Sequence, residues 1–280
     1  MPERYFIIGD PVSHSISPCI HNALFKHYGI DARYEALRVT ADELSEFFHS
    51  LRDTYRGGNV TIPHKVAAIA FMNELGEEAI HTGAINTVTL DADGALRGNN
   101  TDVSGFVYSL ERELGGPIPE PVGIIGAGGA ARGVLYGLIT QGLKEYVLVN
   151  RTRTKAEALL EDFSSLSRGL DITVCKLEGG AYEKALARVN LIVNASALGL
   201  REDFKEFPFE RLKKKTTLVD IVYKKGNTYL VNEGMKRGFT CIDALPMLAA
   251  QAAFAFRHWT KILPDYTMVK KIATNCLEIA

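Results

Sequence analysis

The sequence has few cysteines and no long apolar segment. Its four cysteines, Cys19, Cys175, Cys241 and Cys276, show neither metal-site nor redox-motif spacing, which favours a reducing compartment. No apolar run is long enough to span a bilayer. The N-terminal residues lack the apolar core and the cleavage site of a signal peptide. These absences predict a soluble cytoplasmic protein, and the histidine spacing gives no indication of a metal site.

The chain also has almost no net charge. Its 32 Lys and Arg and 33 Asp and Glu leave a formal charge of −1 over 280 residues. No overall field would therefore attract nucleic acid or an anionic membrane. Hydrophobic residues make up 46% of the chain, as in ordinary globular proteins, and the length favours one or two domains. We expect a small-molecule partner, no nucleic acid or membrane partner, and a monomer or homodimer.

The most informative motif is a glycine-rich turn, G-A-G-G-A-A, at residues 126–131. An apolar strand at 122–125 leads into it and a helical run at 132–140 follows, an order typical of dinucleotide-binding folds. Gly126 would allow the tight turn, and Gly128 would let the backbone approach a pyrophosphate at the helix N-terminus. The candidate phosphate-binding residues are Gly126, Ala127, Gly128, Gly129 and Ala130.

A second motif indicates which dinucleotide binds. About twenty residues after the turn, where an NAD-binding protein usually carries an acidic residue, this chain has Asn150-Arg151-Thr152. With Arg151 in place of Asp or Glu, the chain lacks a carboxylate that would repel a 2′-phosphate and has a cation that would bind it. The motif therefore predicts NADP rather than NAD, although an arginine taken alone is usually surface charge.

Strands and helices alternate along most of the chain, which predicts an α/β fold. In the first part we expect a hairpin at 85–99 and a helix at 64–73, and the last forty residues read as helical. The other expected strands lie at 4–9, 33–39, 59–62, 121–126, 145–150, 171–175, 189–194, 216–222 and 239–242.

Three polar clusters, at 13–18, 59–65 and 98–102, lie where a predicted strand ends and a helix begins. Ligands collect at that edge of α/β sheets. A dehydrogenase that reduces a ketone needs a proton donor and polar groups that fix the carbonyl, and these clusters contain both. Taken alone, Lys65 is typical of a solvated lysine, and Ser17 or Asp102 of a helix cap. The histidines near these clusters are more often structural than catalytic.

At these clusters the sequence resembles the shikimate dehydrogenase family. The matching segments are 9–22 (G-D-P-V-S-H-S-I-S-P-C-I-H-N), 58–65 (G-N-V-T-I-P-H-K), 83–87 (G-A-I-N-T), 98–106 (G-x-N-T-D-x-x-G-F), 126–131, 150–152 and 247–252 (M-L-x-x-Q-A). The resemblance implies two α/β lobes. Residues 1–102 would form a substrate-binding and catalytic domain, completed by C-terminal helices at 244–280 that pack back on it. Residues 103–120 would be a connecting helix and linker, and residues 121–243 a Rossmann NADP-binding domain.

The resemblance also implies a reaction and its residues. The reaction would be the reversible, NADPH-dependent reduction of 3-dehydroshikimate to shikimate, in chorismate and aromatic amino acid biosynthesis. Lys65 would be the general acid and base, and Asp102 would hydrogen-bond Lys65 and the substrate. The implied binding residues are Ser15, Ser17 and Tyr223 for the carboxylate; Thr61, Asn86 and Gln251 for ring hydroxyls; Asn150, Arg151, Thr152 and Lys155 for the 2′-phosphate; and Ile221, Ala244 and Met247 near the nicotinamide.

The chain departs from the family pattern on the cofactor side. Lys224-Lys225 follow Tyr223 where a proline is usual, and Ala244 stands where a glycine would let the backbone approach the cofactor. The serines at 15 and 17 favour shikimate over quinate. Two alternatives stay open: a quinate-type dehydrogenase of broader substrate or NAD specificity, and a catalytically weak NADP-binding sensor. The intact Lys65 and Asp102 argue against the sensor, because a pure binder needs neither.

Overall fold

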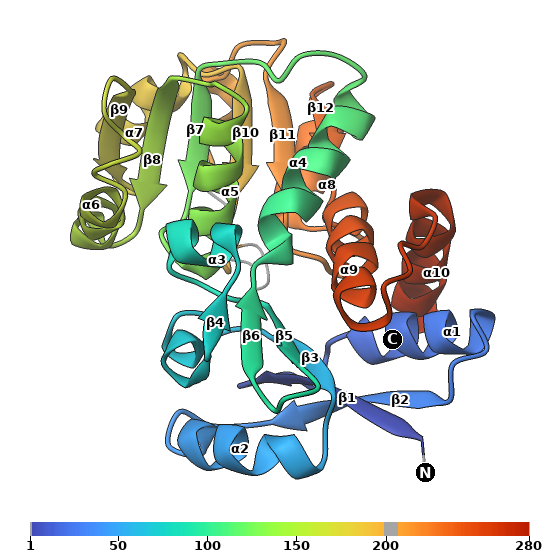
Figure 1. Cartoon of the computed structure of the whole chain (residues 1–280). Coiled ribbons are helices and arrows are strands. Elements are labelled where there is room, and N and C mark those ends of the chain that lie inside the picture. Colours follow the sequence, from blue (N-terminus) through green and yellow to red (C-terminus); the bar gives the residue numbers. More distant parts are fainter. Residues whose placement is uncertain (1, 199–206, 280) are drawn as a thin grey trace. The chain divides into compact units, whose positions relative to one another are not determined.

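The described residues form two six-stranded sheets, each in its own unit. The computed structural model describes residues 2–198 and 207–279 (Figure 1). Unit 1 comprises Met1–Gly105 with Leu248–Ala280, and unit 2 comprises Phe106–Met247. The predicted α/β architecture is confirmed. Within the described ranges, no helix has both the length and the apolar character that a membrane crossing requires.

The sheet of unit 1 is mixed, with the strand order β2-β1-β3-β5-β6-β4. Strand β1 runs parallel to β2 and β3, whereas β5 runs antiparallel to β3 and β6, so the predicted hairpin is present. The strands are β1 (Glu3–Gly9), β2 (Ala32–Arg38), β3 (Gly57–Val60), β4 (Glu74–Leu75), β5 (Thr87–Leu90) and β6 (Leu96–Asn99).

Helices of unit 1 come from both ends of the chain. The early ones are α1 (Ser17–His27), α2 (Leu44–Ser50), the 3₁₀ turns η1 (Leu51–Asp53) and η2 (Ala67–Phe71), and α3 (Glu77–Thr82). Helix α4 (Thr101–Leu114) begins in unit 1, and α9 (Leu245–Thr260) and α10 (Tyr266–Ile279) close the chain. Figure 1 shows α9 and α10 beside α1. Trp259 of α9 donates a hydrogen bond to the Val88 carbonyl of β5 (3.0 Å), so the predicted packing of the C-terminal helices on the first lobe is confirmed.

The core of unit 1 follows from apolar residues on the strands. Phe6 and Ile8 of β1 are fully buried, and they pack with Phe48 of α2 and Val88 of β5. Phe6 contacts the ring of Tyr55 edge-on at 5.4 Å between centroids. Burying such side chains supplies the main favourable free energy of folding, and here it fixes the sheet edge that holds the polar clusters.

The helix predicted at 64–73 is wrong. The chain instead makes turns and then the short 3₁₀ segment η2. The physical reason lies at Lys65, whose backbone carbonyl accepts a hydrogen bond from the Ile85 N–H (2.8 Å). In an α-helix that carbonyl would accept from the residue four positions later. Pairing with the chain ahead of β5 therefore replaces the helix.

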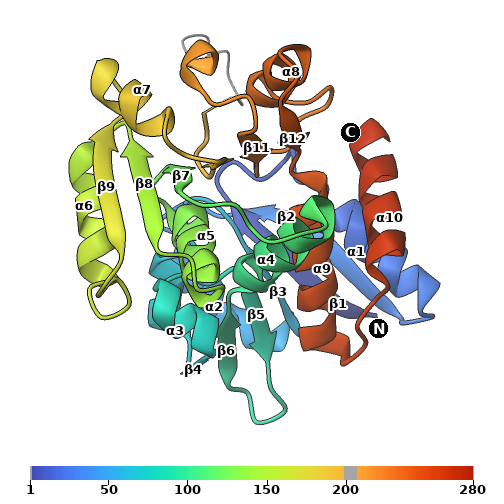
Figure 2. The same cartoon turned by 90° about the horizontal axis from the view of Figure 1, so that it is seen from above.

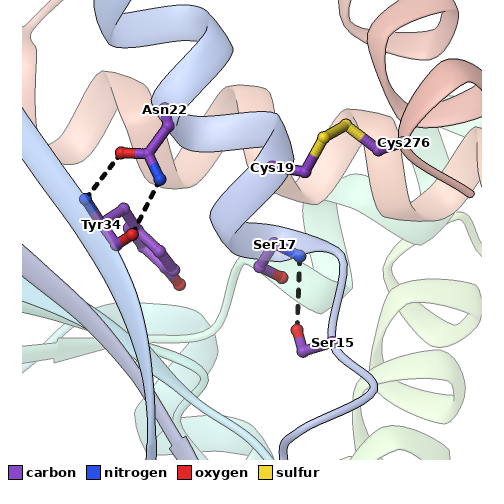
Figure 3. Close-up of a disulfide and its surroundings, with 6 residues drawn as sticks. All are labelled: Ser15, Ser17, Cys19, Asn22, Tyr34 and Cys276. Atoms are coloured by element: carbon purple, nitrogen blue, oxygen red, sulfur yellow. Dashed lines mark hydrogen bonds between the residues drawn. A yellow bond between two sulfur atoms is a disulfide. The ribbon is translucent and has the colours of Figure 1, made fainter. Parts of the chain in front are cut away.

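A disulfide joins Cys19 of α1 to Cys276 of α10, with the two Cα atoms 5.9 Å apart (Figure 3). Spacing gave no sign of this pair, because 257 positions separate the two residues and only the fold brings them together. Disulfides persist mainly in oxidising compartments, so the pairing does not support the reducing compartment inferred from the cysteine pattern.

The sheet of unit 2 is parallel throughout, with the order β12-β11-β10-β7-β8-β9. Counted from β7, this is the doubly wound order 3-2-1-4-5-6, which confirms the predicted Rossmann fold. Its strands are β7 (Val122–Ile125), β8 (Glu145–Asn150), β9 (Asp171–Lys176), β10 (Leu191–Asn194), β11 (Thr217–Asp220) and β12 (Thr240–Ile242).

Helices cover both faces of this second sheet. They are α5 (Gly129–Thr140), α6 (Arg153–Asp162), α7 (Gly180–Leu186) and α8 (Tyr229–Lys236), with the 3₁₀ turn η3 (Phe209–Arg211). Figure 2 shows α7 and α8 on one face and α5 on the other. Because both faces are covered, strands such as β7 are buried along their whole length.

Candidate active site

The polar clusters of unit 1 meet at one edge of its sheet. Strands β1 and β3 are parallel, with Ile8 opposite Val60, so the segments that follow them leave from the same edge. The antiparallel β5 begins there, since the Val60 N–H donates to the Asn86 carbonyl (2.9 Å). Strand β6 ends there too, with Asn99 opposite Thr87. The topology therefore brings together clusters that are far apart in the sequence.

Lys65 and Asp102 form an ion pair at this edge. The Nζ of Lys65 lies 2.5 Å from Oδ2 of Asp102, and the side chains are only 14% and 9% exposed. The Nδ2 of Asn86 donates to the other carboxylate oxygen, Oδ1, at 2.8 Å. Asp102 also lies in the first turn of α4, where the helix dipole favours a negative charge. The carboxylate is thus held at both oxygens and directs the lysine.

Asn86 has a larger structural role than the sequence predicted. Its buried Oδ1 accepts hydrogen bonds from the Thr101 N–H and from the Thr87 hydroxyl, both at 2.8 Å. It therefore caps the start of α4 and orients Asp102. Asp102 itself is not the cap, because the helix begins at Thr101, and the Asp102 N–H donates to the Asn100 side chain at 3.2 Å.

A further layer of buried polar groups lies behind Asn86. The Nδ2 of Asn59 donates to the Asn86 carbonyl (2.9 Å), and the Tyr34 hydroxyl donates to Oδ1 of Asn59 (2.6 Å). Sequence reasoning assigned no role to Asn59 or Asn100, although both stand in the polar clusters. The signal that would have found them is an asparagine at the end of a buried strand, where it needs internal partners.

Ser15 and Ser17 lie at the N-terminus of α1. The Ser17 N–H donates to Oγ of Ser15 (3.3 Å), as Figure 3 shows. Ser17 is the first helical residue and is followed by Pro18, so it is not the N-cap; Ile16 takes that position without a side-chain hydrogen bond. Two hydroxyls at a helix N-terminus suit an anion such as a carboxylate, because the dipole adds to their donors.

A glycine packs closely against each of the candidate residues Thr61 and Gln251. A Cβ on Gly9 would lie 2.5 Å from Cγ2 of Thr61, so only glycine lets β1 pass this close. A Cβ on Gly105 would lie 2.8 Å from the backbone N of Gln251, so this glycine lets α9 approach α4 one turn after Asp102. The structure thus places Gln251 beside the start of α4.

The glycine-rich turn of unit 2 fits a pyrophosphate. Gly126 has φ +123°, and a Cβ there would lie 2.7 Å from the Ala195 carbonyl oxygen, so no other residue is accommodated. Gly128 is the N-cap of α5, and apart from its chain neighbours no atom of the described residues lies within 4 Å of the position its Cβ would take. The backbone of Gly128 is therefore open to a ligand, and Gly129 and Ala130 follow as the first helical residues.

The 2′-phosphate candidates lie at the end of β8. Nδ2 of Asn150 donates to the Thr152 carbonyl (2.8 Å), and Thr152 is the N-cap of α6. Arg151 and Lys155 are exposed, and in the described part of the chain neither has an ion-pair partner. Arg153, in contrast, pairs with Glu157 of its own helix at 2.8 Å. Arg151 and Lys155 are therefore available for a phosphate.

Buried Asp220 organises the segment predicted to lie near the nicotinamide. It accepts hydrogen bonds from the Val222 N–H (3.0 Å) and the Thr228 hydroxyl (2.6 Å), and burial raises its pKa to about 6. The Ile221 N–H donates to the Asn194 carbonyl at 3.1 Å. Tyr223 follows in unit 2, and its contact with a substrate stays a prediction. Sequence reasoning missed Asp220.

Ala244 directly precedes α9 and Met247 lies in its first turn, and both are buried. Burial is what a core methionine would show. The Leu245 N–H donates to Oδ1 of Asp243 (2.9 Å), so Asp243 caps this helix. The contacts of Ala244 and Met247 with a cofactor stay predictions.

Comparison with known proteins decides the family. Residues 7–88 match the shikimate dehydrogenase substrate binding domain, and residues 113–223 match shikimate / quinate 5-dehydrogenase. The shikimate dehydrogenase (NADP(+)) of Lysinibacillus sphaericus is 37% identical over 270 residues, which cover 95% of this chain and 94% of that protein. The chain belongs to the shikimate dehydrogenase family. The family predicted from the motifs is therefore confirmed, and the chain is an oxidoreductase.

Solved structures of family members have the same fold. The shikimate 5-dehydrogenase of Thermus thermophilus, solved with NADP(H) and shikimate, has a TM-score of 0.86 and 36% identity; the match covers 98% of this chain and 100% of that one. The quinate dehydrogenase of Corynebacterium glutamicum, solved with NAD, has a TM-score of 0.87 at 27% identity, with 98% and 99% covered. The fold alone therefore does not distinguish a shikimate dehydrogenase from a quinate dehydrogenase.

Proposed function

We propose that this protein catalyses the reversible reduction of 3-dehydroshikimate to shikimate with NADPH, a step in aromatic amino acid biosynthesis. The observation that carries the proposal is the shielded Lys65–Asp102 pair, held by Asn86 at the edge of the unit 1 sheet. A binding module needs no such pair, whereas a carbonyl reductase needs a positioned proton donor.

Each candidate residue has its own part in the reaction. Ser15 and Ser17 at the N-terminus of α1 bind the substrate carboxylate, with Tyr223 assisting, and Thr61, Asn86 and Gln251 bind ring hydroxyls. NADPH, when bound, supplies a hydride to the ring carbonyl carbon. Lys65 donates a proton from Nζ to the carbonyl oxygen as the alkoxide develops, and in the reverse direction it takes that proton back. Asp102 keeps Nζ directed at the reacting oxygen.

The cofactor is NADP, as predicted. Residues Gly126, Ala127, Gly128, Gly129 and Ala130 hold its pyrophosphate at the N-terminus of α5, where the open space beside Gly128 supports close approach. Arg151 and Lys155 bind the 2′-phosphate, and Asn150 and Thr152 shape the turn that carries Arg151. Ile221, Ala244 and Met247 complete the nicotinamide end.

A matrix of four assays tests the proposal. Shikimate or quinate is supplied with NADP or NAD, and the absorbance of the reduced nicotinamide is followed. We expect the highest kcat/KM with shikimate and NADP. Higher kcat/KM with quinate or with NAD would assign the protein to the broader dehydrogenases instead. Tight NADP binding without turnover of any substrate would support a sensor.

The cellular location and the assembly state are further proposals. A cytoplasmic location is favoured by the biosynthetic reaction, and it predicts that cytoplasmic reductants keep a fraction of Cys19 and Cys276 reduced. Trapping the thiols with an alkylating agent during lysis measures that fraction. We propose a monomer or homodimer, which light scattering on the purified protein distinguishes from larger assemblies.

A further inference from the structure

A half-buried carboxylate that the proposed mechanism does not use lies next to the candidate site. Glu78 of α3 accepts a hydrogen bond from the hydroxyl of Ser104. Ser104 lies in the first turn of α4, two residues after Asp102. Glu78 therefore joins two elements that are 26 residues apart in the sequence.

Several side chains hold the first turn of α4. The first N–H groups of a helix have no acceptor within the helix and need one from elsewhere. The Thr101 N–H donates to Asn86, and the N–H groups of Asp102 and Val103 donate to Asn100. The side chain of Ser104, in the same turn, donates to Glu78. Asn86, Asn100 and Glu78 thus all bind the turn that carries Asp102.

A second connection holds α3 against the same turn. The Thr82 hydroxyl donates to the Glu78 carbonyl (2.6 Å), and Nδ2 of Asn100 donates to that hydroxyl (3.0 Å). The carboxylates of Glu78 and Asp102 are also close enough to interact. Burial, and then the charge of Asp102, raise the pKa of Glu78, whereas the Ser104 hydrogen bonds oppose that rise. Glu78 is therefore connected to Asp102 through Thr82 and Asn100 as well as through Ser104.

We propose that Glu78 is a positioning residue for the reaction. Through Ser104 it fixes the first turn of α4, and so holds the Asp102 carboxylate where it pairs with Lys65. The inference rests on the roles given to Lys65 and Asp102 in the proposed function. Glu78 itself touches neither substrate nor cofactor in this role.

The test is a double-mutant cycle between Glu78 and Asp102, with kcat as the readout. Glu78→Ala should lower kcat about tenfold in the native chain and less than about twofold in the Asp102→Asn background, because effects that act through a shared residue are not additive. The KM for NADP should be unchanged in both backgrounds, since the candidate 2′-phosphate residues lie in unit 2. Glu78→Gln keeps an acceptor oxygen for Ser104 and should restore most of the lost turnover.

Matched controls separate this effect from general destabilisation. Glu74→Ala removes an exposed carboxylate of β4 that pairs with Arg97 and should leave kcat unchanged. Ser104→Ala should reproduce part of the Glu78→Ala loss. Ser109→Ala should not, because the Ser109 hydroxyl only donates to the Phe106 carbonyl of its own helix. Ser104→Ala also keeps the test available where Glu78→Ala fails to fold.

Three outcomes would overturn the inference. Native turnover in Glu78→Ala would show that Asp102 needs no support from α3. An equal loss in both backgrounds would show that Glu78 acts on stability and not through Asp102. Native turnover in Asp102→Asn alone would overturn the proposed role of Asp102 first, and this inference with it.

Discussion

Residues 85 and 86 fix both the backbone of Lys65 and, by way of Asp102, its side chain. Its Nζ lies 2.5 Å from Oδ2 of Asp102, and its backbone carbonyl accepts the Ile85 N–H at 2.8 Å. The next residue, Asn86, donates to the same Asp102 carboxylate. Residues 85 and 86 therefore fix the lysine through its backbone and through its partner, and the ammonium group keeps one direction without the support of a helix.

Lys65→Ala should lower kcat by about 100-fold or more, the range expected when a general acid is removed. The KM for shikimate should change little, because the lost interaction matters mainly in the transition state. Steady-state kinetics with shikimate and NADP measure both parameters. Lys214→Ala, at an exposed lysine of unit 2, is the control and should behave as the native chain. Turnover within a few-fold of native in Lys65→Ala would contradict its role as the proton donor.

Arg151→Ala should raise the KM for NADP about tenfold or more, since a hydrogen bond to a charged group contributes roughly 1.5–3 kcal/mol. The KM for NAD should hardly change, because NAD has no 2′-phosphate. The ratio of kcat/KM for NADP over NAD should therefore narrow. Arg153→Ala is the matched control, because Arg153 is already paired with Glu157. An unchanged ratio in Arg151→Ala would assign the 2′-phosphate to another residue.

Local patterns in the sequence predicted most of the fold. The alternating apolar strands, the glycine-rich turn and the Asp91–Gly94 turn of the hairpin depend on neighbouring residues, and all were found in the structure. The helix predicted at 64–73 was wrong because the Ile85 N–H donates a hydrogen bond to the Lys65 carbonyl. No local pattern reveals this contact.

The candidate site shows the same difference between what the sequence predicted and what only the structure reveals. The resemblance singled out Lys65, Asp102 and Asn86, and the structure brings them into contact. It did not reveal Asn59, Asn100 or Glu78, because each has partners far away in the sequence: the Asn86 carbonyl for Asn59, Thr82 and Ala84 for Asn100, and the Ser104 hydroxyl for Glu78. Buried polar groups must find partners, and their partners are set by strand order and not by sequence spacing.

Acid should destabilise the protein through His21. This side chain is fully buried, and among the described residues neither ring nitrogen has a hydrogen-bond partner; it stacks on Tyr34 at 4.6 Å between centroids. Burial lowers the pKa of His21 from 6.5 to about 3. Between those pH values the unfolded chain binds a proton that the folded chain does not. The free energy of unfolding contributed by His21 is complete above pH 6.5 and falls by about 1.4 kcal/mol per unit as the pH drops toward 3.

Urea unfolding between about pH 7 and about pH 5 measures this slope. His21→Phe keeps an aromatic ring in the stack and should reduce the slope, whereas His14→Ala, at an exposed histidine, should keep it. Where His21→Phe fails to fold, NMR titration of the native imidazole gives the same information. An imidazole that takes up a proton near pH 6.5 in the folded protein would refute the prediction.

Reduction of the Cys19–Cys276 disulfide should destabilise unit 1. The bond closes a loop of 257 positions and joins α1 to α10, so it removes much conformational freedom from the unfolded chain. The free energy of unfolding should fall by about 2–5 kcal/mol when the bond is reduced, the range found when native disulfides are removed. Cys276→Ser should show the same loss without reductant, and reductant should then have no further effect. Cys241→Ser, at a free thiol of unit 2, is the control. Equal denaturation midpoints for the native chain with and without reductant would show that packing of α10 alone holds the C-terminus in place.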